Sequence, residues 1–407
     1  METRLPLTGV RVADFTWIGA GPTCTRLLAF FGAEVIIVES YTRGGIRMQT
    51  PQAKGPEGSP NLSGFFNNLN SCKRSITLNM RTPEGIAIGR KLIGLSDIVV
   101  NNFAPGVMDR WGLSYQELRK ENPGIIMGEM PVGGRWGLLK NIIGYGATVE
   151  AFAGINELTG YPDRPPTGTE INYPDYASNP YHFATAILTA LHHRNQTGRG
   201  QYIEVAQFES TASVMDTLVL DYTVNGNIQT RTGNHVSYAS PHAVYRCQGD
   251  DRWVAVAVTS EAEWSGFKRA LGNPAWAVDH RFDTFEGRKT HEEALDGFIE
   301  GWTSQHTPEE IMHSLQAAGV PAGVVQNMED AMRRDPQLAQ RGFYVQLEHP
   351  EAGLTTYDGL VARLSATPGQ LRAPAPCLGE ANDYVFRELL GMSEDEVNRF
   401  IMQEVIH

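Results

Sequence analysis

The chain of 407 residues is 41% hydrophobic and 20% charged, which is typical of a globular protein with a large core in two domains, or in one domain with an insertion. Its formal net charge of −12 argues against a nucleic-acid partner, because neutralising phosphates needs a basic surface. A small anionic ligand is compatible with this charge, since a local basic pocket can lie on an acidic protein.

The cysteines and the N-terminal residues limit the class of protein further. Four cysteines are spread along the chain without a C-x-x-C spacing, so neither a disulfide framework nor a zinc site is predicted. Residues 1–9 lack an apolar signal core, and no stretch reaches the roughly 18 apolar residues of a membrane helix. We therefore expect a cytoplasmic protein with no membrane partner and no metal site.

The first third of the chain alternates predicted strands and helices. Strands are expected over residues 10–15, 34–39, 97–100 and 125–128, and helices over 25–31, 82–95 and 114–121. Repeated β-α-β units with apolar strands predict a mostly parallel sheet with helices on both faces.

The character of the chain changes after about residue 223, where turn signals appear. Before this point we expect helices at 181–194 and 207–222, with a strand at 201–205 between them. After it we expect a hairpin at 243–258, followed by helices at 262–271, 290–305 and 308–318. The fold class predicted is α/β. A large domain is expected from residues 1–222 and 325–407, with a smaller α+β domain at 223–324 between them.

The turn after the first predicted strand has two interpretations. Gly19-x-Gly21 resembles the start of a dinucleotide-binding fingerprint, with Glu39 near the position of a ribose-binding acid. The third glycine of that fingerprint is Cys24 here, which weakens this interpretation. The alternative is a tight strand-to-helix turn whose helix N-terminus could receive an anionic group.

Two polar segments are candidates for ligand binding. Asn102, Phe103 and Arg110 follow the third predicted strand, and parallel α/β sheets bind ligands beyond the carboxyl ends of their strands. They offer an amide, a flat apolar face and a fixed positive charge. Lys73 and Arg74 could hold phosphates. The alternatives are a turn with a surface arginine, and a pair of solvated cations.

Asp175 precedes the helix predicted at 181–194. A loop aspartate usually forms a turn or caps a helix. Because Ser178 or Asn179 could cap this helix, Asp175 is not needed as the cap. Loops are enriched in functional residues, so Asp175 is a candidate for a functional role. The histidines predict no metal site, and the sequence lacks the Gly-x-Ser-x-Gly turn of serine hydrolases.

These segments occur together in the order typical of one family. The segments concerned are Asp14-Phe15-Thr16 with Gly19–Pro22, then Asn70–Leu78, Asn102–Gly112, Asp175-Tyr176, Thr197–Gln201, Arg372-Ala373-Pro374 and Leu378-Gly379-Glu380. In their order and spacing they resemble the class III CoA-transferases of the CaiB/BaiF type, which include formyl-CoA transferase. The resemblance covers nearly the whole chain.

The resemblance implies two chains threaded through each other as an interlocked dimer. Each chain would have a large Rossmann-like domain built from both chain ends and a smaller domain between them. The resemblance also implies that Asp175 is the nucleophile and that coenzyme A is a substrate, with no cofactor. The residues implied along the CoA are Ile18, Lys73, Arg74, Asn102, Phe103, Arg110 and Tyr145.

Departures from the family bear on the substrate. The family often has Gln at the position of Gly19, beside the acyl site, and an arginine at the position of Ser40. Whether Arg43 or Arg47 replaces that arginine stays open. The glycine-rich loop of formyl-CoA transferase is not evident, so neither formate nor oxalate is expected. Arginines near the site and the small Gly19 lead us to expect a dicarboxylate.

The expected reaction is transfer of CoA from an acyl-CoA such as succinyl-CoA to a carboxylic acid, through an aspartyl anhydride and an aspartyl-CoA thioester. Racemases of the family carry a His-Asp pair where this chain has Tyr145-Gly146, which cannot supply a base with a pKa near 7. An acyl-CoA racemase or isomerase is one alternative. The other is a CoA-binding subunit that needs a partner chain. A homodimer is expected, and a heteromer with a related chain stays open.

Overall fold

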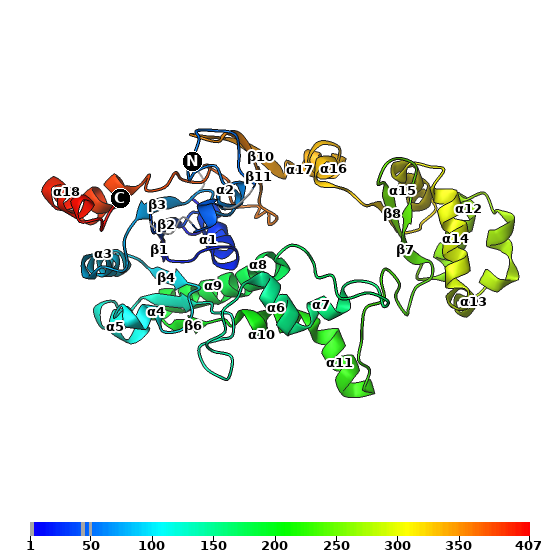
Figure 1. Cartoon of the computed structure of the whole chain (residues 1–407), viewed down its shortest axis with the longest axis horizontal. Helices are drawn as coiled ribbons and strands as arrows, with labels where there is room; N and C mark the ends of the chain where they lie inside the picture. Colours follow the sequence, from blue (N-terminus) through cyan, green and yellow to red (C-terminus); the bar gives the residue numbers. More distant parts are fainter. Residues whose placement is uncertain (1–3, 42–44, 49–50) are drawn as a thin grey trace. The chain divides into compact units, whose positions relative to one another are not determined.

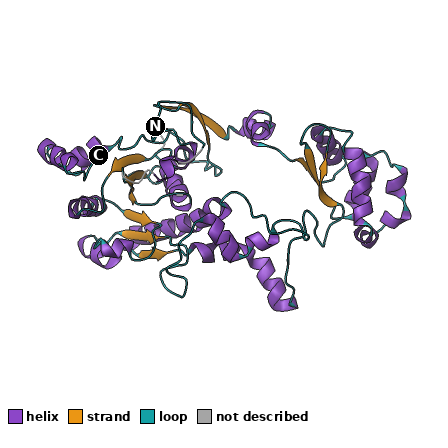
Figure 2. Cartoon of the chain, in the orientation of Figure 1, coloured by secondary structure: helices purple, strands orange, loops and turns teal. Residues whose placement is uncertain are grey.

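The computed structural model describes residues 4–41, 45–48 and 51–407 (Figure 1). Helices and strands are mixed along the chain (Figure 2). Among the described residues, no helix combines the length and the apolar composition that crossing a bilayer requires. The chain divides into two compact units: a larger one of the described residues up to Glu157 with 167–229 and 340–407, and a smaller one of 158–166 and 230–339.

The larger unit is organised around a six-stranded sheet in which every neighbouring pair of strands is parallel. The strand order is β3-β2-β1-β4-β5-β6, that of a doubly wound α/β sheet, in which the winding reverses between β1 and β4. The strands are β1 (Arg11–Asp14), β2 (Glu34–Glu39), β3 (Arg74–Thr77), β4 (Ile98–Asn101), β5 (Ile126–Glu129) and β6 (Tyr202–Glu204).

Helices cover both faces of this sheet, as the apolar strands predicted. Alternate residues of a strand point to opposite faces. Val12 therefore packs with α1 (Ala20–Phe30) and α9 (Asn179–Thr197), whereas Ala13 packs with α3 (Pro83–Gly94) and α5 (Tyr115–Glu121) on the other side. The α/β fold class predicted from the sequence is confirmed.

The C-terminal segment completes the larger unit. Residues of the π-helix η5 (Tyr384–Leu389) and of α18 (Glu394–Met402) belong to the same apolar cluster as Ala13. The hairpin β10 (Tyr344–His349) and β11 (Gly353–Asp358) is tied to α1 by Arg26, whose guanidinium donates to both carboxylate oxygens of Asp358 at 3.2 and 3.1 Å.

Shorter elements surround the carboxyl ends of the strands. They are η1 (Gly45–Met48), α2 (Gly64–Leu69), α4 (Val107–Arg110), α6 (Gly146–Ala153), α7 (Ile155–Leu158), α8 (Tyr173–Ala177), α10 (Gln207–Ala212), η2 (Ser213–Met215) and α11 (Asp216–Asn225). The single helix predicted over 207–222 is thus three consecutive pieces.

The smaller unit is an antiparallel sheet of order β7-β8-β9 packed on helices. Its first two strands form the predicted hairpin. Its elements are β7 (His242–Arg246), β8 (Trp253–Ala257), α12 (Glu261–Ala270), η3 (Ala275–Val278), η4 (His280–Phe282), α13 (Phe285–Thr290), α14 (Glu292–Thr303), α15 (Pro308–Ala317), β9 (Ala322–Val324), α16 (Met328–Arg333) and α17 (Pro336–Arg341), the last of which crosses into the larger unit.

The domain boundaries differ from those expected at 222/223 and 324/325. Besides residues 158–166, the smaller unit consists of a segment that starts at residue 230, since α11, which continues to Asn225, belongs to the larger unit. It continues to residue 339, because Asp330 in α16 forms an ion pair with Arg252 at the start of β8. Turn signals in the sequence mark the first change of character, but they do not reveal this long-range ion pair.

Candidate active site

A cavity of about 780 Å³ lies in the larger unit beyond the carboxyl ends of β1 to β4. Its lining includes Thr16–Ala20, Glu39–Tyr41, Leu78–Arg81 and Asn102–Ala104 from the loops after these strands, with Tyr145 and Asp175 from later segments. Doubly wound sheets bind ligands at this edge, beside the point where the winding reverses. The volume is within the range of small-molecule and cofactor sites.

Asp175 is the buried acid of this cavity. It lies in the short helix α8 and is 2% exposed. Its Oδ2 accepts the N–H of Gly146 at 3.3 Å. Within the described residues, neither its Oδ1 nor Nδ2 of Asn179 has a partner in hydrogen-bond geometry. The carboxylate is therefore both desolvated and incompletely hydrogen-bonded.

The pKa of Asp175 follows from this environment. Burial raises the pKa to about 6, the N–H of Gly146 and the side chain of Asn179 oppose the rise, and the carboxylate of Glu150 adds to it. The group is still ionised at neutral pH. An ionised but poorly solvated carboxylate can act as a nucleophile without a separate base.

Gly19 brings the backbone of the β1–α1 turn against this carboxylate. A β-carbon at this position would lie only 2.9 Å from Oδ2 of Asp175. The preceding Ile18 has φ of +66°, which is unusual for a β-branched residue and typical of strained functional turns. Asn102 fixes the turn, because its Oδ1 accepts the N–H of Trp17 at 3.0 Å and its Nδ2 donates to Trp17 O at 2.8 Å.

Five of the residues expected along the CoA do line the cavity: Ile18, Asn102, Phe103, Arg110 and Tyr145. Phe103 packs edge-to-face with Trp111, with ring centroids 5.6 Å apart. Tyr145 is half-exposed at the start of α6. Arg110 is exposed and has no ion-pair partner in the described part of the chain. Their contacts with CoA stay a prediction.

Lys73 is not among the described residues that line the cavity, so the structure gives no support to the CoA contact expected for it. Its side chain is fully buried, with Nζ 2.9 Å from Pro22 O, 2.7 Å from Thr25 Oγ1, 2.9 Å from Asn70 Oδ1 and 3.4 Å from Asp14 Oδ2. Burial lowers the pKa of Lys73 to about 8, although Asp14 opposes the shift. Its three N–H donors are all directed to these acceptors, so Lys73 is a structural cation.

Arg74 also lies outside the cavity lining, contrary to the expectation from the sequence. It is the first residue of the edge strand β3, and its Nε is 3.2 Å from a carboxylate oxygen of Glu34, at the start of β2. The guanidinium also lies over the ring of Tyr384, 4.4 Å from the centroid. These contacts direct it away from the carboxyl ends of the strands.

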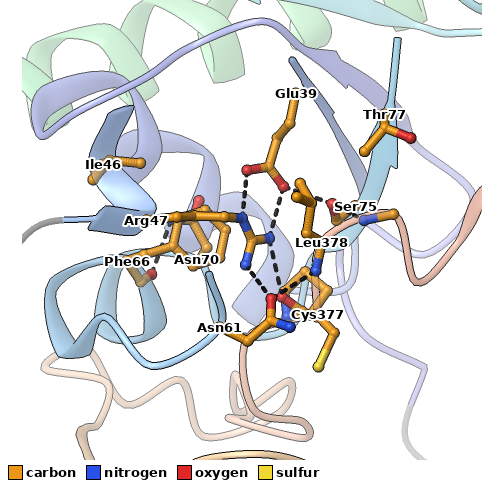
Figure 3. A network of polar contacts seen from close by, with 12 residues as sticks. Glu39, Ile46, Arg47, Asn61, Phe66, Asn70, Ser75, Thr77, Cys377 and Leu378 are labelled. Carbon is orange, nitrogen blue, oxygen red and sulfur yellow. Dashed lines mark hydrogen bonds and ion pairs between the residues drawn. The ribbon is translucent and has the colours of Figure 1, made fainter. Parts of the chain in front are cut away.

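Arg47 lines the cavity, but its guanidinium is already engaged (Figure 3). Nε and Nη2 donate to the two carboxylate oxygens of Glu39, each at 2.7 Å. Nη1 donates to Asn61 Oδ1 at 2.9 Å, and Nη2 also donates to Pro376 O at 3.1 Å. The planar group lies over the ring of Phe66, 3.6 Å from the centroid. Such a bidentate, stacked arginine is a rigid part of the wall.

The Arg47–Glu39 pair decides two expectations from the sequence. Glu39 also accepts a hydrogen bond from Ser75 Oγ at 2.6 Å, so it is not a free ribose-binding acid, which removes a support of the dinucleotide interpretation of the glycine turn. Arg47 is not a free cation for a substrate carboxylate. Arg43, the other candidate for replacing the arginine missing at Ser40, lies outside the described residues.

Comparison with known proteins supports this kind of site. The model of CoA-transferase family III matches residues 7–382. Succinyl-CoA–D-citramalate CoA-transferase of Chloroflexus aurantiacus is 34% identical over 98% of both chains. The beta subunit of succinyl-CoA–L-malate CoA-transferase from the same organism is 33% identical over 99% of both chains. The crystal structure of a CAIB/BAIF family protein from Brucella suis matches with a TM-score of 0.87 and 30% identity, over 95% of this chain and 100% of that one.

These matches and the fold define the class of protein. It is a CoA-transferase, an enzyme that moves coenzyme A between acids. Within that class the chain belongs to CoA-transferase family III, which confirms the resemblance found in the sequence.

We expect Lys73→Met to destabilise the fold by about 3–5 kcal/mol, because Asp14 would become a buried carboxylate without a cation. The Michaelis constant for acyl-CoA should change little in the protein that stays folded. Arg74→Met is the control, since its half-exposed ion pair contributes at most about 1 kcal/mol. Urea unfolding and steady-state kinetics measure both effects. A large rise in KM at unchanged stability would return Lys73 to the CoA site.

The pKa of Asp175 predicts how activity and stability depend on pH. Below about pH 6, kcat/KM should fall about tenfold per pH unit, because the protonated carboxyl is not a nucleophile. The folded-state pKa is raised, so the stability that protonated Asp175 contributes is lost as the pH rises through about 6. Asp175→Asn should therefore melt above the parent at pH 8, with a difference that shrinks as the pH falls from 6 toward 4. A flat activity profile down to pH 4 would contradict this.

Proposed function

We propose that the chain transfers CoA from succinyl-CoA to a dicarboxylic acid, with Asp175 as the nucleophile. The main support is the carboxylate of Asp175, which is 2% exposed and lies against the backbone of Gly19 in the cavity. Its Oδ1 has no hydrogen-bond partner among the residues that the structure describes. A group in this state is ionised, desolvated and accessible from the cavity alone.

The reaction proceeds by exchange of acyl bonds at Asp175. A carboxylate oxygen attacks the thioester carbonyl, the C–S bond breaks, and CoA thiolate leaves behind a mixed anhydride. The thiolate then attacks the Asp175 carbonyl of the anhydride, which releases the donor acid and forms an aspartyl-CoA thioester. The acceptor carboxylate attacks this thioester, and the two steps run in reverse to give the new acyl-CoA and free Asp175. Overall, one CoA thioester is exchanged for another of similar energy, so no ATP is needed.

The burial of Asp175 serves this route. Water would hydrolyse the anhydride, so a site that excludes it protects the intermediate. The carboxylate needs no base to become nucleophilic, because its pKa of about 6 is below neutral pH.

Racemisation is disfavoured by the geometry at position 146. A β-carbon on Gly146 would lie 2.3 Å from the β-carbon of Asn172, so an aspartate would not fit there without a shift of the backbone. Tyr145, at the position of the racemase histidine, has no imidazole to serve as the base. The chain therefore lacks the pair on which the racemase alternative depends.

The relatives support a dicarboxylate acceptor. Two of them are named for succinyl-CoA with D-citramalate or L-malate, and both of these acids are dicarboxylates. The arginines near the site, from which the sequence analysis expected a dicarboxylate, do not support that expectation through Arg47, because Glu39 neutralises its charge. The shared chemistry of the relatives now supports it instead.

We also propose that the active form contains a second chain. Helix α11 buries none of its residues, and Val219, Leu220, Tyr222 and Val224 are all more than half exposed. An apolar helix left uncovered indicates an interface. The malate enzyme in the comparison has an alpha and a beta subunit, so the second chain is either a copy of this one or a related chain. Mass and activity of the purified chain distinguish the two.

Asp175→Asn and Asp175→Ala should each lose several orders of magnitude in CoA-transfer rate, because neither side chain can form the anhydride. Hydroxylamine added during turnover should convert Asp175 of the parent enzyme to a hydroxamate, which mass spectrometry of its peptide detects. Glu117→Gln is the control, since Glu117 is an exposed acid paired with Lys120. A fully active Asp175→Asn enzyme, with no label on that peptide, would exclude the mechanism.

A panel of acids assayed with succinyl-CoA tests the acceptor. Malate, citramalate and glutarate should be turned over faster than acetate and propionate, with formate and oxalate as negative controls. Formation of each new acyl-CoA is followed by liquid chromatography. Turnover confined to monocarboxylates would refute the dicarboxylate assignment while leaving CoA transfer intact.

A further inference from the structure

The proposed reaction makes the side chain of Asp175 an electrophile as well as a nucleophile. CoA thiolate attacks its carbonyl carbon in the anhydride, and the acceptor carboxylate attacks the same carbon in the thioester. In each attack the C=O π electrons move onto the carbonyl oxygen, and they return when the leaving group departs. N–H donors placed on the oxygen that becomes negative lower the barrier to such steps. The backbone N–H of Gly146, 3.3 Å from Oδ2 of Asp175, is one donor in position.

Asn179 carries a second buried donor that nothing in the resting structure uses. It is the first residue of α9 and is 0% exposed. Its Nδ2 has no hydrogen-bond partner in the part of the chain that the structure describes. A buried amide that has lost its water without gaining a partner destabilises the fold, so native proteins leave few of them. We therefore looked for a state of the enzyme in which this N–H is satisfied.

The backbone brings Asn179 to the side of Asp175. Between α8 and α9, the N–H of Ser178 donates to Pro174 O at 3.4 Å, and the N–H of His182 donates to Ser178 O at 3.1 Å. Helical hydrogen bonding therefore continues from one helix into the next. Residues four apart on a helix are neighbours on one face, which places the side chains of Asp175 and Asn179 together. In agreement, the side chain of Asn179 lowers the pKa of Asp175 against the effect of burial.

Thr211 sets the direction in which the amide of Asn179 points. The hydroxyl of this buried residue of α10 lies 3.4 Å from Oδ1 of Asn179 and also donates to Gln207 O at 2.8 Å. With the amide oxygen on the Thr211 side, Nδ2 is directed to the side of Asp175. The reverse orientation would put the amide oxygen beside the carboxylate, where the two negative groups repel each other.

We propose that Asn179 is a catalytic residue whose Nδ2 donates to the carbonyl oxygen of acylated Asp175 and, with the N–H of Gly146, stabilises the oxyanion formed there. Oδ1 of Asp175, which has no partner among the described residues, is then the oxygen that attacks the thioester and carries the acyl group. Oδ2, already on the N–H of Gly146, remains the carbonyl oxygen. The proposal rests on the proposed function, because it requires an acylated Asp175, but it does not depend on which acids are exchanged.

Asn179→Ala should lower kcat about 100-fold at about pH 9, where Asp175 is ionised, because one oxyanion donor is lost. The Kd of CoA should not change, since Asn179 is not among the described residues that line the cavity. Asn179→Asp keeps the size of the side chain without the donor, and it should lose at least as much activity. Ser178→Ala is the matched control, because its hydroxyl is also buried, unpartnered in the described ranges and outside the lining. It should keep full activity.

Hydroxylamine identifies the step that Asn179 assists. In the anhydride it attacks either the Asp175 carbonyl, which leaves a hydroxamate on the enzyme, or the acyl carbonyl, which releases an acyl hydroxamate and free Asp175. Loss of the donor slows the first attack alone. With succinyl-CoA, Asn179→Ala should therefore shift trapping from the Asp175 peptide toward succinyl hydroxamate, after subtraction of the succinyl hydroxamate formed with Asp175→Asn. Mass spectrometry of the peptide and chromatography of the small product give the ratio.

The results distinguish this proposal from the proposed function. Unchanged kcat of Asn179→Ala at about pH 9, with only the acid limb of the profile displaced, would limit Asn179 to the ionisation of Asp175. A fall in kcat with an unchanged trapping ratio, or an equal fall in Ser178→Ala, would make its role structural. Each of these results overturns the proposal, and urea unfolding curves check that all variants fold. A parent enzyme that transfers CoA without any label on Asp175 would instead overturn the proposed function.

Discussion

The structure of the site depends on one constraint, which is that a carboxylate stays ionised after most of its water has been removed. Burial is the largest cause that raises the pKa of Asp175, with a smaller contribution from the carboxylate of Glu150, and a backbone and an amide dipole limit the rise to about 6. A lower pKa would mean a better solvated, less reactive oxygen, and a pKa well above 7 would leave a neutral acid. The surrounding elements keep the group between these limits.

Two glycines make this environment possible by forming walls from backbone alone. Gly19 lies so close to Asp175 that any β-carbon would contact Oδ2, and Gly146 places its N–H on the same oxygen while packing against Asn172. The N-termini of α1 and α6 therefore both begin beside the carboxylate. Their positive ends favour its charged form, which offsets part of the desolvation.

Local patterns in the sequence predicted the fold better than the site. The apolar strands and the caps of α3 predicted the parallel sheet, because both signals act over a few residues. The sequence singled out Asp175 because Ser178 or Asn179 could cap the following helix in its place. In the structure, neither of those side chains forms a capping hydrogen bond at the start of α9. The burial of Lys73 could not be predicted, because its partner Asp14 is 59 residues away and the local sequence does not distinguish a buried lysine from a solvated one.

The buried Lys73 is connected to the site through a chain of contacts. Lys73 forms an ion pair with Oδ2 of Asp14. Oδ1 of Asp14 accepts two hydrogen bonds from Thr16, one from its N–H at 2.9 Å and one from its hydroxyl at 2.6 Å. Thr16 begins the turn that leads to Gly19 and the carboxylate of Asp175. Burying an ion pair rarely adds stability over an apolar alternative. Keeping one beneath this turn is better explained by orientation, because hydrogen bonds to a fixed charge define the backbone where the close approach to the carboxylate requires it.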